Sequence, residues 1–216
     1  MKIGAFDSGK GGVAILDAIK KLLPNEEYSY IADSKNCPYG EKSDSELYEI
    51  VTNNIKKLQD WGAVIVVIAC NTATTKCIDR LREDFPELYF IGTEPAVKLA
   101  VDSGAKNILV LATPGTIKSE HLQNILHENQ NPNQKIKLLA CPGLADAIEF
   151  DRDIDTVLQN LFADINTDEP EAVVIGCTHY SLIKDKLQSY FPHAKLIDGN
   201  NMIANQVKNL TEKLHV

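Results

Sequence analysis

Residues 63–74 read AVIVVIACNTAT and residues 172–180 read AVVIGCTHY, which places Cys177 at 107 positions after Cys70. In both stretches an unbroken aliphatic run ends in a cysteine, and small polar residues follow it. Continuous apolar runs are typical of strands that are covered on both faces of a parallel sheet. The polar residues after each cysteine are typical of the start of a helix. The chain is therefore expected to contain the same strand-to-helix unit twice.

Short apolar runs alternate with longer amphipathic ones along the chain. Strands are expected at residues 2–6, 28–32, 63–69, 89–92, 107–112, 136–140, 172–176 and 194–197. Helices are expected between them, among others at residues 12–23, 45–59, 73–84 and 116–129. This alternation predicts an α/β fold with parallel sheets.

The strand candidates form two sets of four. Each member of the first set matches a member of the second at an offset of 105 to 108 residues. We therefore expect two similar parallel-sheet α/β lobes related by pseudo-two-fold symmetry, residues 1–97 plus 198–216 and residues 98–197. Ligands of open α/β sheets bind beyond the carboxyl ends of the strands. The active site is expected in the cleft between the lobes.

Composition excludes several classes of protein. The chain has 216 residues, with 22 Lys and Arg against 30 Asp and Glu, and a formal net charge of −8. This balance argues against a binder of nucleic acids or anionic membranes. The longest apolar run, residues 63–70, is far below the roughly 18 residues of a membrane-spanning helix. The chain begins MKIGAFD, and charged residues this close to the start argue against a signal peptide. The number of cysteines is odd, at five, and they are expected to be the free thiols of a cytoplasmic protein.

Polar residues follow the predicted strands, where a ligand would lie. Asp7 and Ser8 open the glycine-rich turn DSGKGG, which matches neither a Walker A loop nor a GxGxxG dinucleotide fingerprint. Cys70 and Cys177 each precede a helix start, whose free N–H groups lower the pKa of a thiol and bind carboxylates. These four residues are expected to lie close to the ligand.

The other three cysteines have no matched cysteine in the opposite half of the chain. Most buried free cysteines act only as small hydrophobic side chains. We interpret Cys77 and Cys141 in this way, and we assign no role to Cys37, which is expected to be partly exposed. A metal site is not expected, because no C-x₂-C spacing is present and the histidines are scattered.

Two thiols that face each other across a cleft suit racemisation. One thiolate removes the Cα proton of the substrate while the opposing thiol donates a proton to the other face. A free thiol has a pKa of about 8.5 and needs neighbouring groups to react. The candidates for proton transfer are Asp7, Glu149 and His179. The candidate donors to the carboxylate of the carbanion are Asn71, Thr72 and Thr178. No cofactor-binding signature is evident.

Six segments are similar to one known family. They are residues 6–12 (FDSGKGG), 33–43 (DSKNCPYGEKS), 70–74 (CNTAT), 94–95 (EP), 112–116 (ATPGT) and 176–180 (GCTHY). They follow one another in the order found in that family, between about residue 3 and about residue 200. On these segments the chain resembles the glutamate racemases, within the cofactor-independent aspartate/glutamate racemase superfamily.

The resemblance implies a two-base reaction without a cofactor, in which Cys70 acts on the D-enantiomer and Cys177 on the L-enantiomer. It implies that Asp7, His179 and Glu149 assist the two thiols. Contacts with the substrate are implied at Asp7, Ser8, Tyr39, Gly40, Asn71, Thr72, Thr113, Thr178 and His179. The N–H groups around Tyr39 and Gly40 would hold the side-chain carboxylate. The α-carboxylate would be held by Asn71, Thr72, Thr113 and Thr178. The product D-glutamate would serve peptidoglycan synthesis in the cytoplasm, and the enzyme would form a homodimer.

Three alternatives stay open. An aspartate racemase, or one of broader specificity, differs by one methylene of the substrate, which is worth only about 1–3 kcal/mol of discrimination. A thiol hydrolase would use Cys177 with His179 and Asp7, in the pattern of nucleophile, base and orienting group. A catalytically inactive protein would keep the fold for binding or regulation alone.

Overall fold

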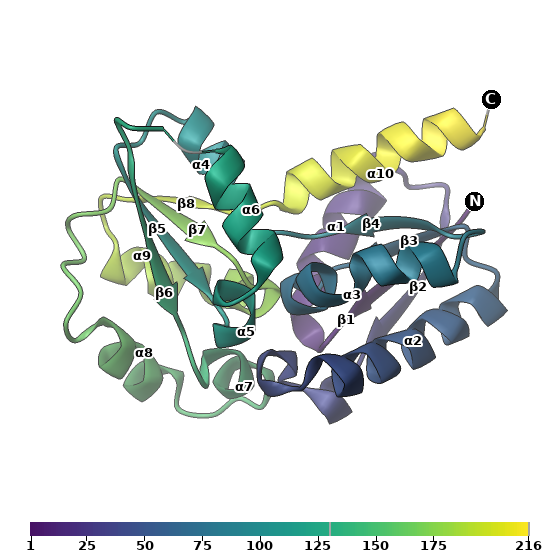
Figure 1. Cartoon of the computed structure of the whole chain (residues 1–216), viewed down its shortest axis with the longest axis horizontal. Helices are drawn as coiled ribbons and strands as arrows, with labels where there is room; N and C mark the ends of the chain where they lie inside the picture. The colour runs from purple at the N-terminus through teal and green to yellow at the C-terminus, as the bar shows by residue number, and fades with distance from the viewer. Residues whose placement is uncertain (130, 216) are drawn as a thin grey trace.

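The structure, a computed structural model of the chain, describes residues 1–129 and 131–215. In this part of the chain two four-stranded parallel sheets form, in two lobes that lie side by side (Figure 1). The strand order is β2-β1-β3-β4 in one sheet and β6-β5-β7-β8 in the other. The two orders are the same when β1 to β4 are replaced by β5 to β8. The prediction of two similar parallel-sheet α/β lobes is confirmed.

The strands begin and end close to the expected residues. The first sheet contains β1 (Lys2–Asp7), β2 (Glu27–Ala32), β3 (Ile65–Ile68) and β4 (Tyr89–Gly92). The second contains β5 (Asn107–Ala112), β6 (Lys135–Ala140), β7 (Ala172–Ile175) and β8 (Lys195–Ile197). The α-helices are α1 (Val13–Leu22), α2 (Asp44–Trp61), α3 (Asn71–Asp84), α4 (Val97–Asp102), α5 (Pro114–Ile117), α6 (Glu120–Glu128), α7 (Leu144–Glu149), α8 (Ile154–Phe162), α9 (Lys184–Tyr190) and α10 (Asn200–Leu214). The 3₁₀ helices are η1 (Lys10–Gly12), η2 (Ser34–Asn36), η3 (Tyr39–Glu41) and η4 (Thr178–Ile183).

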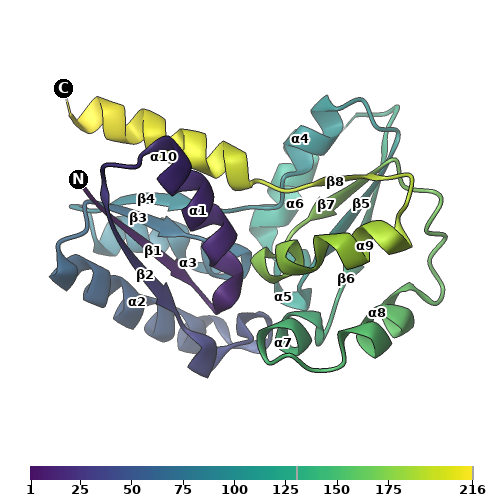
Figure 2. The same ribbon diagram turned by 180° about the vertical axis from the view of Figure 1, so that it is seen from behind.

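Helices cover both faces of the first sheet (Figures 1 and 2). Alternate residues of β3 point to opposite faces, as in any strand. Val66 and Ile68 pack with α2 and α3, whereas Ile65 and Val67 pack with α1 and α10. All four side chains are fully buried, which explains the unbroken aliphatic run.

The end of the chain packs on the first lobe. After β8 the chain leaves the second sheet, and α10 lies beside α1 (Figure 2). Its Ile203, Ala204 and Val207 are buried in the same cluster as Ile3 of β1. The lobe bounds 1–97 plus 198–216 and 98–197 stay a prediction, and residue 216 lies outside the described residues. No helix within the described residues is both long and apolar enough to cross a membrane.

The expected single helix over residues 116–129 is wrong. The structure has two helices here, α5 and α6, separated by Lys118 and Ser119. The Ser119 hydroxyl accepts the N–H of Leu122 at 3.2 Å and caps the start of α6. Apolar residues at helical spacing continue across this break, so their pattern alone does not reveal it.

Candidate active site

The predicted site residues follow the central strands of both sheets. Asp7 ends β1, Cys70 follows β3, Thr113 follows β5 and Cys177 follows β7. These strand ends meet where the lobes contact each other. One cavity there is lined by Ser8, Cys37, Pro38, Tyr39, Gly40, Cys70, Asn71, Thr72, Thr113, Ala145, Cys177 and His179. Asp7, Thr178 and Glu149 are not part of the lining but contact residues around it.

Cys70 is a buried thiol, 5% exposed, at the N-terminus of α3. Burial and the negative charge of Asp7 raise the pKa of this thiol to about 11. The Ser8 hydroxyl and the N–H groups of Ala73 and Thr72 act against this rise by donating to the sulfur. The helix start therefore offsets part of the cost of placing a thiolate here.

Cys177 is the matching thiol of the second lobe, 8% exposed, at the start of η4. Burial raises its pKa well above the ordinary value, and a charge on Cys70 raises it further. The N–H groups of His179 and Tyr180 lower it. The Sγ atom lies 3.9 Å from Nδ1 of His179. Among the described residues, an imidazole lies beside the second thiol and not beside the first. A charge on either thiol opposes a charge on the other.

Asp7 is fully buried and does not line the cavity. One carboxylate oxygen accepts the N–H of Gly12 at 2.8 Å, and the Thr178 hydroxyl lies 3.2 Å from the same oxygen. Burial raises the pKa of Asp7, although His179 and these hydrogen bonds act in the opposite direction. The carboxylate therefore joins the turn after β1 to the start of η4 across the lobes.

Glu149 makes a second buried connection between the lobes. Its Oε2 lies 2.8 Å from Nε2 of His179 and accepts the N–H of Lys10 at 2.9 Å. Its Oε1 accepts a hydrogen bond from Ser34 of the first lobe. Burial raises the pKa of Glu149, but the three hydrogen bonds together lower it below the ordinary value. Cys177, His179 and Glu149 therefore form a chain of thiol, imidazole and carboxylate.

This chain corrects the grouping expected for a thiol hydrolase. The orienting carboxylate on His179 is Glu149, whereas Asp7 bonds Thr178 and Gly12. Sequence reasoning also missed Ser34. This residue lies in the matching segment 33–43 but received no role, because its contact with Glu149 depends on how the lobes meet.

Three threonine hydroxyls form a buried cluster at the lobe boundary. Thr72 lies 3.0 Å from Thr113 and 3.2 Å from Thr116, and Thr113 lies 3.1 Å from Thr116. Thr113 also caps α5 by accepting the N–H of Thr116. Thr116 belongs to a matching segment but received no role from the sequence. The cap uses only the backbone N–H of Thr116, so the matching segment is the one signal in the sequence that could have pointed to this side chain.

Tyr39 and Gly40 lie on a loop of the first lobe held by Asp33. The Tyr39 hydroxyl donates to Asp33 Oδ2 at 2.6 Å, and Asn54 donates to the same oxygen at 3.1 Å. Gly40 sits against Thr113, since a Cβ added to this glycine would lie 3.1 Å from the Cβ of Thr113. The loop thus closes one side of the cavity.

The lining named above contains neither Lys nor Arg, so an anion in the cavity would be held by hydroxyl and N–H groups. Asn71 is 7% exposed, and its Oδ1 has no hydrogen-bond partner among the described residues. An unpaired buried acceptor is costly in a folded protein. Asn71 is therefore suited to accept a hydrogen bond from a ligand.

The remaining cysteines lie as the sequence predicted. Cys77 and Cys141 are each 2% exposed in the apolar cores of their lobes. Cys37 is partly exposed at the rim of the cavity. The five thiols are all free.

Comparisons with known proteins agree with this geometry. The sequence profile of the Asp/Glu/Hydantoin racemase family matches residues 12–207. Glutamate racemase of Campylobacter curvus is 39% identical over 228 residues, which cover 100% of this chain and 85% of that protein. Glutamate racemase of Clostridium acetobutylicum is 36% identical over 219 residues, covering 99% and 85%.

A solved structure resembles the whole chain. The crystal structure of Escherichia coli glutamate racemase, in complex with L-glutamate and an activator, has a TM-score of 0.89 and 30% identity, with 98% of this chain and 82% of that chain covered. An allantoin racemase from Klebsiella pneumoniae shares only the fold, with 18% identity and a TM-score of 0.60. The chain therefore belongs to the Asp/Glu/Hydantoin racemase family and is an amino-acid racemase of the glutamate racemase kind.

Proposed function

We propose that the chain interconverts L- and D-glutamate by proton transfer at Cα between Cys70 and Cys177, without a cofactor. The observation that carries the proposal is that two buried thiols at equivalent strand ends line one cavity. Each lies on a different lobe, so a substrate between the lobes meets one thiol on each face.

The reaction balances with one thiolate and one thiol. For L-glutamate, the thiolate of Cys177 takes the Cα proton, and the bond electrons stay on the substrate as a carbanion. The thiol of Cys70 then donates its proton to the opposite face, which leaves D-glutamate and a Cys70 thiolate. The reverse direction starts from that thiolate. His179, oriented by Glu149, and Asp7 assist in restoring the protons.

Neutral donors around the cavity would stabilise the two carboxylates of the substrate. The loop at Tyr39 and Gly40 would bind the side-chain carboxylate through backbone N–H groups. The α-carboxylate, on which charge develops, would be bound by Asn71, Thr72, Thr113 and Thr178. Preorganised donors in a cavity closed to water act strongly on developing charge. The unpaired Oδ1 of Asn71 would accept the substrate ammonium.

We further propose that the D-glutamate serves peptidoglycan synthesis in the cytoplasm and that the enzyme is a homodimer. The family likeness supports these points. The native mass of the purified chain tests the dimer, and rescue of a D-glutamate auxotroph tests the role in the cell wall.

The test of the reaction uses L-glutamate and L-aspartate, each incubated with the enzyme in D₂O. We expect deuterium at Cα of glutamate, with circular dichroism of the solution falling to zero. Exchange confined to aspartate would identify an aspartate racemase instead.

A thiol hydrolase is the second candidate, because Cys177, His179 and Glu149 are arranged as nucleophile, base and orienting group. This reading leaves Cys70 without a role. It predicts that Cys70→Ser keeps the activity on an activated ester, whereas the racemase proposal predicts that Cys70→Ser abolishes racemisation.

A further inference from the structure

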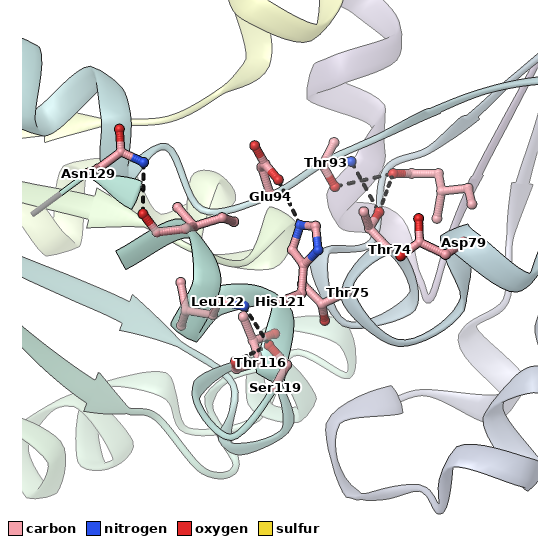
Figure 3. A network of polar contacts seen from close by, with 12 residues as sticks. Thr74, Thr75, Asp79, Thr93, Glu94, Thr116, Ser119, His121, Leu122 and Asn129 are labelled. Carbon is pink, nitrogen blue, oxygen red and sulfur yellow. Dashed lines mark hydrogen bonds and ion pairs between the residues drawn. The ribbon is translucent and has the colours of Figure 1, made fainter. Parts of the chain in front are cut away.

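Two adjacent residues directly after β4, Thr93 and Glu94, make polar contacts with different elements (Figure 3). The Thr93 hydroxyl is buried and lies 2.5 Å from the carbonyl oxygen of Ala69 and 3.2 Å from that of Ile68. The Thr93 N–H donates to the Thr74 hydroxyl at 3.1 Å. Because Ala69 directly precedes Cys70, Thr93 fixes the end of β4 to the strand end that carries the first thiol.

Glu94, the next residue, reaches the second lobe. Its Oε2 lies 2.8 Å from Nε2 of His121 on α6, and Figure 3 shows the imidazole pointing at this carboxylate. Two residues earlier, the Ser119 hydroxyl donates to the carbonyl oxygen of Thr116 at 2.7 Å. Thr116 in turn belongs to the buried threonine cluster of the site. The turn that carries His121 is thus joined to the cavity.

Several charged side chains of the first lobe act on the imidazole of His121. Besides Glu94, the charge of Asp79 raises the pKa of His121 and the charge of Arg82 lowers it; both residues belong to α3. The hydrogen bond to Glu94 is the main cause that raises the pKa of His121, and partial burial acts against it. The side chains of His121 and Glu94 are 31% and 42% exposed, so solvent screens the pair. The contact is an ion pair when His121 is protonated. When His121 is neutral, it is a hydrogen bond from the imidazole to the charged carboxylate.

We propose that the Glu94–His121 pair is an interlobe tie that sets how the second lobe closes over Cys70, which makes both residues positioning residues of the racemase. The pair lies where the chain first crosses between the lobes. Closure sets the separation of Cys70 and Cys177, which stand on different lobes, so a small change in lobe orientation alters both proton transfers. The inference rests on the proposed function, because only a two-thiol reaction needs this separation.

The kinetic test compares Glu94→Ala, His121→Ala and the double variant with wild type, using glutamate. Asp102→Asn is the matched control, since Lys98 and Asp102 form an exposed ion pair at 2.7 Å within α4 alone. We expect kcat/KM to fall about fivefold in each single variant. The double variant should lose no more, because either substitution alone already removes the contact between the two residues. The control should keep the wild-type value. Unchanged kcat/KM in the single variants, or losses that multiply in the double variant, would overturn the proposal.

A conservative variant separates positioning from packing. His121→Gln keeps an amide donor for Glu94 but does not titrate. We expect it to restore most of the lost kcat/KM near pH 8 and to fall behind wild type below pH 7, where a protonated His121 adds the ionic attraction. A constant ratio of the two proteins over this pH range would contradict the tie.

A readout without turnover distinguishes failure of the tie from failure of the proposed function. The N–H of Lys10 donates to Glu149 across the lobe boundary, so its hydrogen exchange reports closure in the free enzyme. We expect faster exchange in Glu94→Ala and His121→Ala than in Asp102→Asn. Suppose that the Lys10 N–H exchanges faster in the two tie variants, as expected, but that the wild-type chain does not racemise glutamate. This result would refute the proposed function and would still support the tie. Equal exchange in all variants would refute the tie.

Discussion

The two lobes place a cysteine at the same strand end but surround it differently. Cys70 opens the 14-residue helix α3 and receives donors from Ser8 and from the N–H groups of that helix. Cys177 opens the 3₁₀ helix η4 and has an imidazole, linked to Glu149, at 3.9 Å. A repeated fold thus supplies two equivalent positions. In the proposed reaction, the local residues decide how each thiol gains and loses its proton.

This difference between the lobes cannot change the ratio of kcat/KM for L-glutamate to kcat/KM for D-glutamate. The enantiomers have equal free energies in water, so the equilibrium constant is one, and kcat/KM must be the same in both directions for every variant. The asymmetry between the lobes must therefore be sought in single proton transfers.

The largest effect is expected from the thiols themselves. Cys70→Ser and Cys177→Ser should each lower the kcat of glutamate racemisation by about 1,000-fold or more. A serine hydroxyl is a far weaker acid than a thiol, so it donates its proton poorly and hardly forms the anion that would act as the base. Circular dichroism of D- and L-glutamate solutions measures both directions. Cys77→Ala is the control, since this thiol is buried in the first-lobe core away from the cavity lining, and its kcat should stay within about twofold. A large loss in only one of the two serine variants would contradict a reaction that needs both thiols.

His179→Asn should lower kcat by about 100-fold, within the range of a lost general acid–base group. The substitution removes the imidazole beside Cys177 and leaves the surroundings of Cys70 intact. Proton transfer at Cys177 then limits the rate more strongly. In the proposed reaction Cys177 removes the deuteron of α-deuterated L-glutamate. We therefore expect a larger primary isotope effect with this substrate than with the α-deuterated D-enantiomer. Glu149→Gln should shift the isotope effects in the same direction. Equal isotope effects for the two enantiomers would contradict the assignment of His179 to the second thiol.

Most of the fold could be predicted from the sequence because the strands are covered on both faces. Burial on both sides turns β3 and β7 into continuous apolar runs, and the matched offsets then place them in equivalent lobes. The break between α5 and α6 was not predictable from periodicity, because Leu122 and Ile125 continue the apolar spacing past Ser119.

The sequence predicted the site residues at the strand ends, but it did not predict the contacts between the lobes. Residues at or just beyond the ends of the central strands, such as Asp7 and Cys70, are brought together by the topology of a parallel sheet. Contacts between lobes depend on how two packed units meet, and the sequence carries no local pattern for that. This is why the pairing of Glu149 with Ser34 and of Glu94 with His121 emerged only from the structure.

Alkaline pH should weaken the fold through the thiols. Burial raises the pKa of Cys70 from 9.0 to about 11, so the folded chain holds this proton in a range where the unfolded chain has lost it. The stabilisation is complete below pH 9 and is lost as the pH rises through 11. At pH 10 the free energy of unfolding should be lower than at pH 8 by about 1 kcal/mol for this thiol alone. Urea unfolding at the two pH values measures the loss, and Cys70→Ser should remove that share. An identical pH dependence in wild type and Cys70→Ser would show that other groups cause the decline.

The smallest effect is expected from Ser8→Ala, which tests the first lobe as His179→Asn tests the second. The Ser8 hydroxyl lowers the pKa of Cys70 by donating to its sulfur, so the loss of one hydrogen bond should reduce kcat by about two- to tenfold. The affected transfer is now at Cys70, and the isotope pattern should reverse, with the larger effect for α-deuterated D-glutamate. Ser8→Thr, which keeps the hydroxyl, is the matched control. If Ser8→Ala instead enlarges the isotope effect of the L-enantiomer, the roles given to the two thiols must be exchanged, although both would still be needed for racemisation.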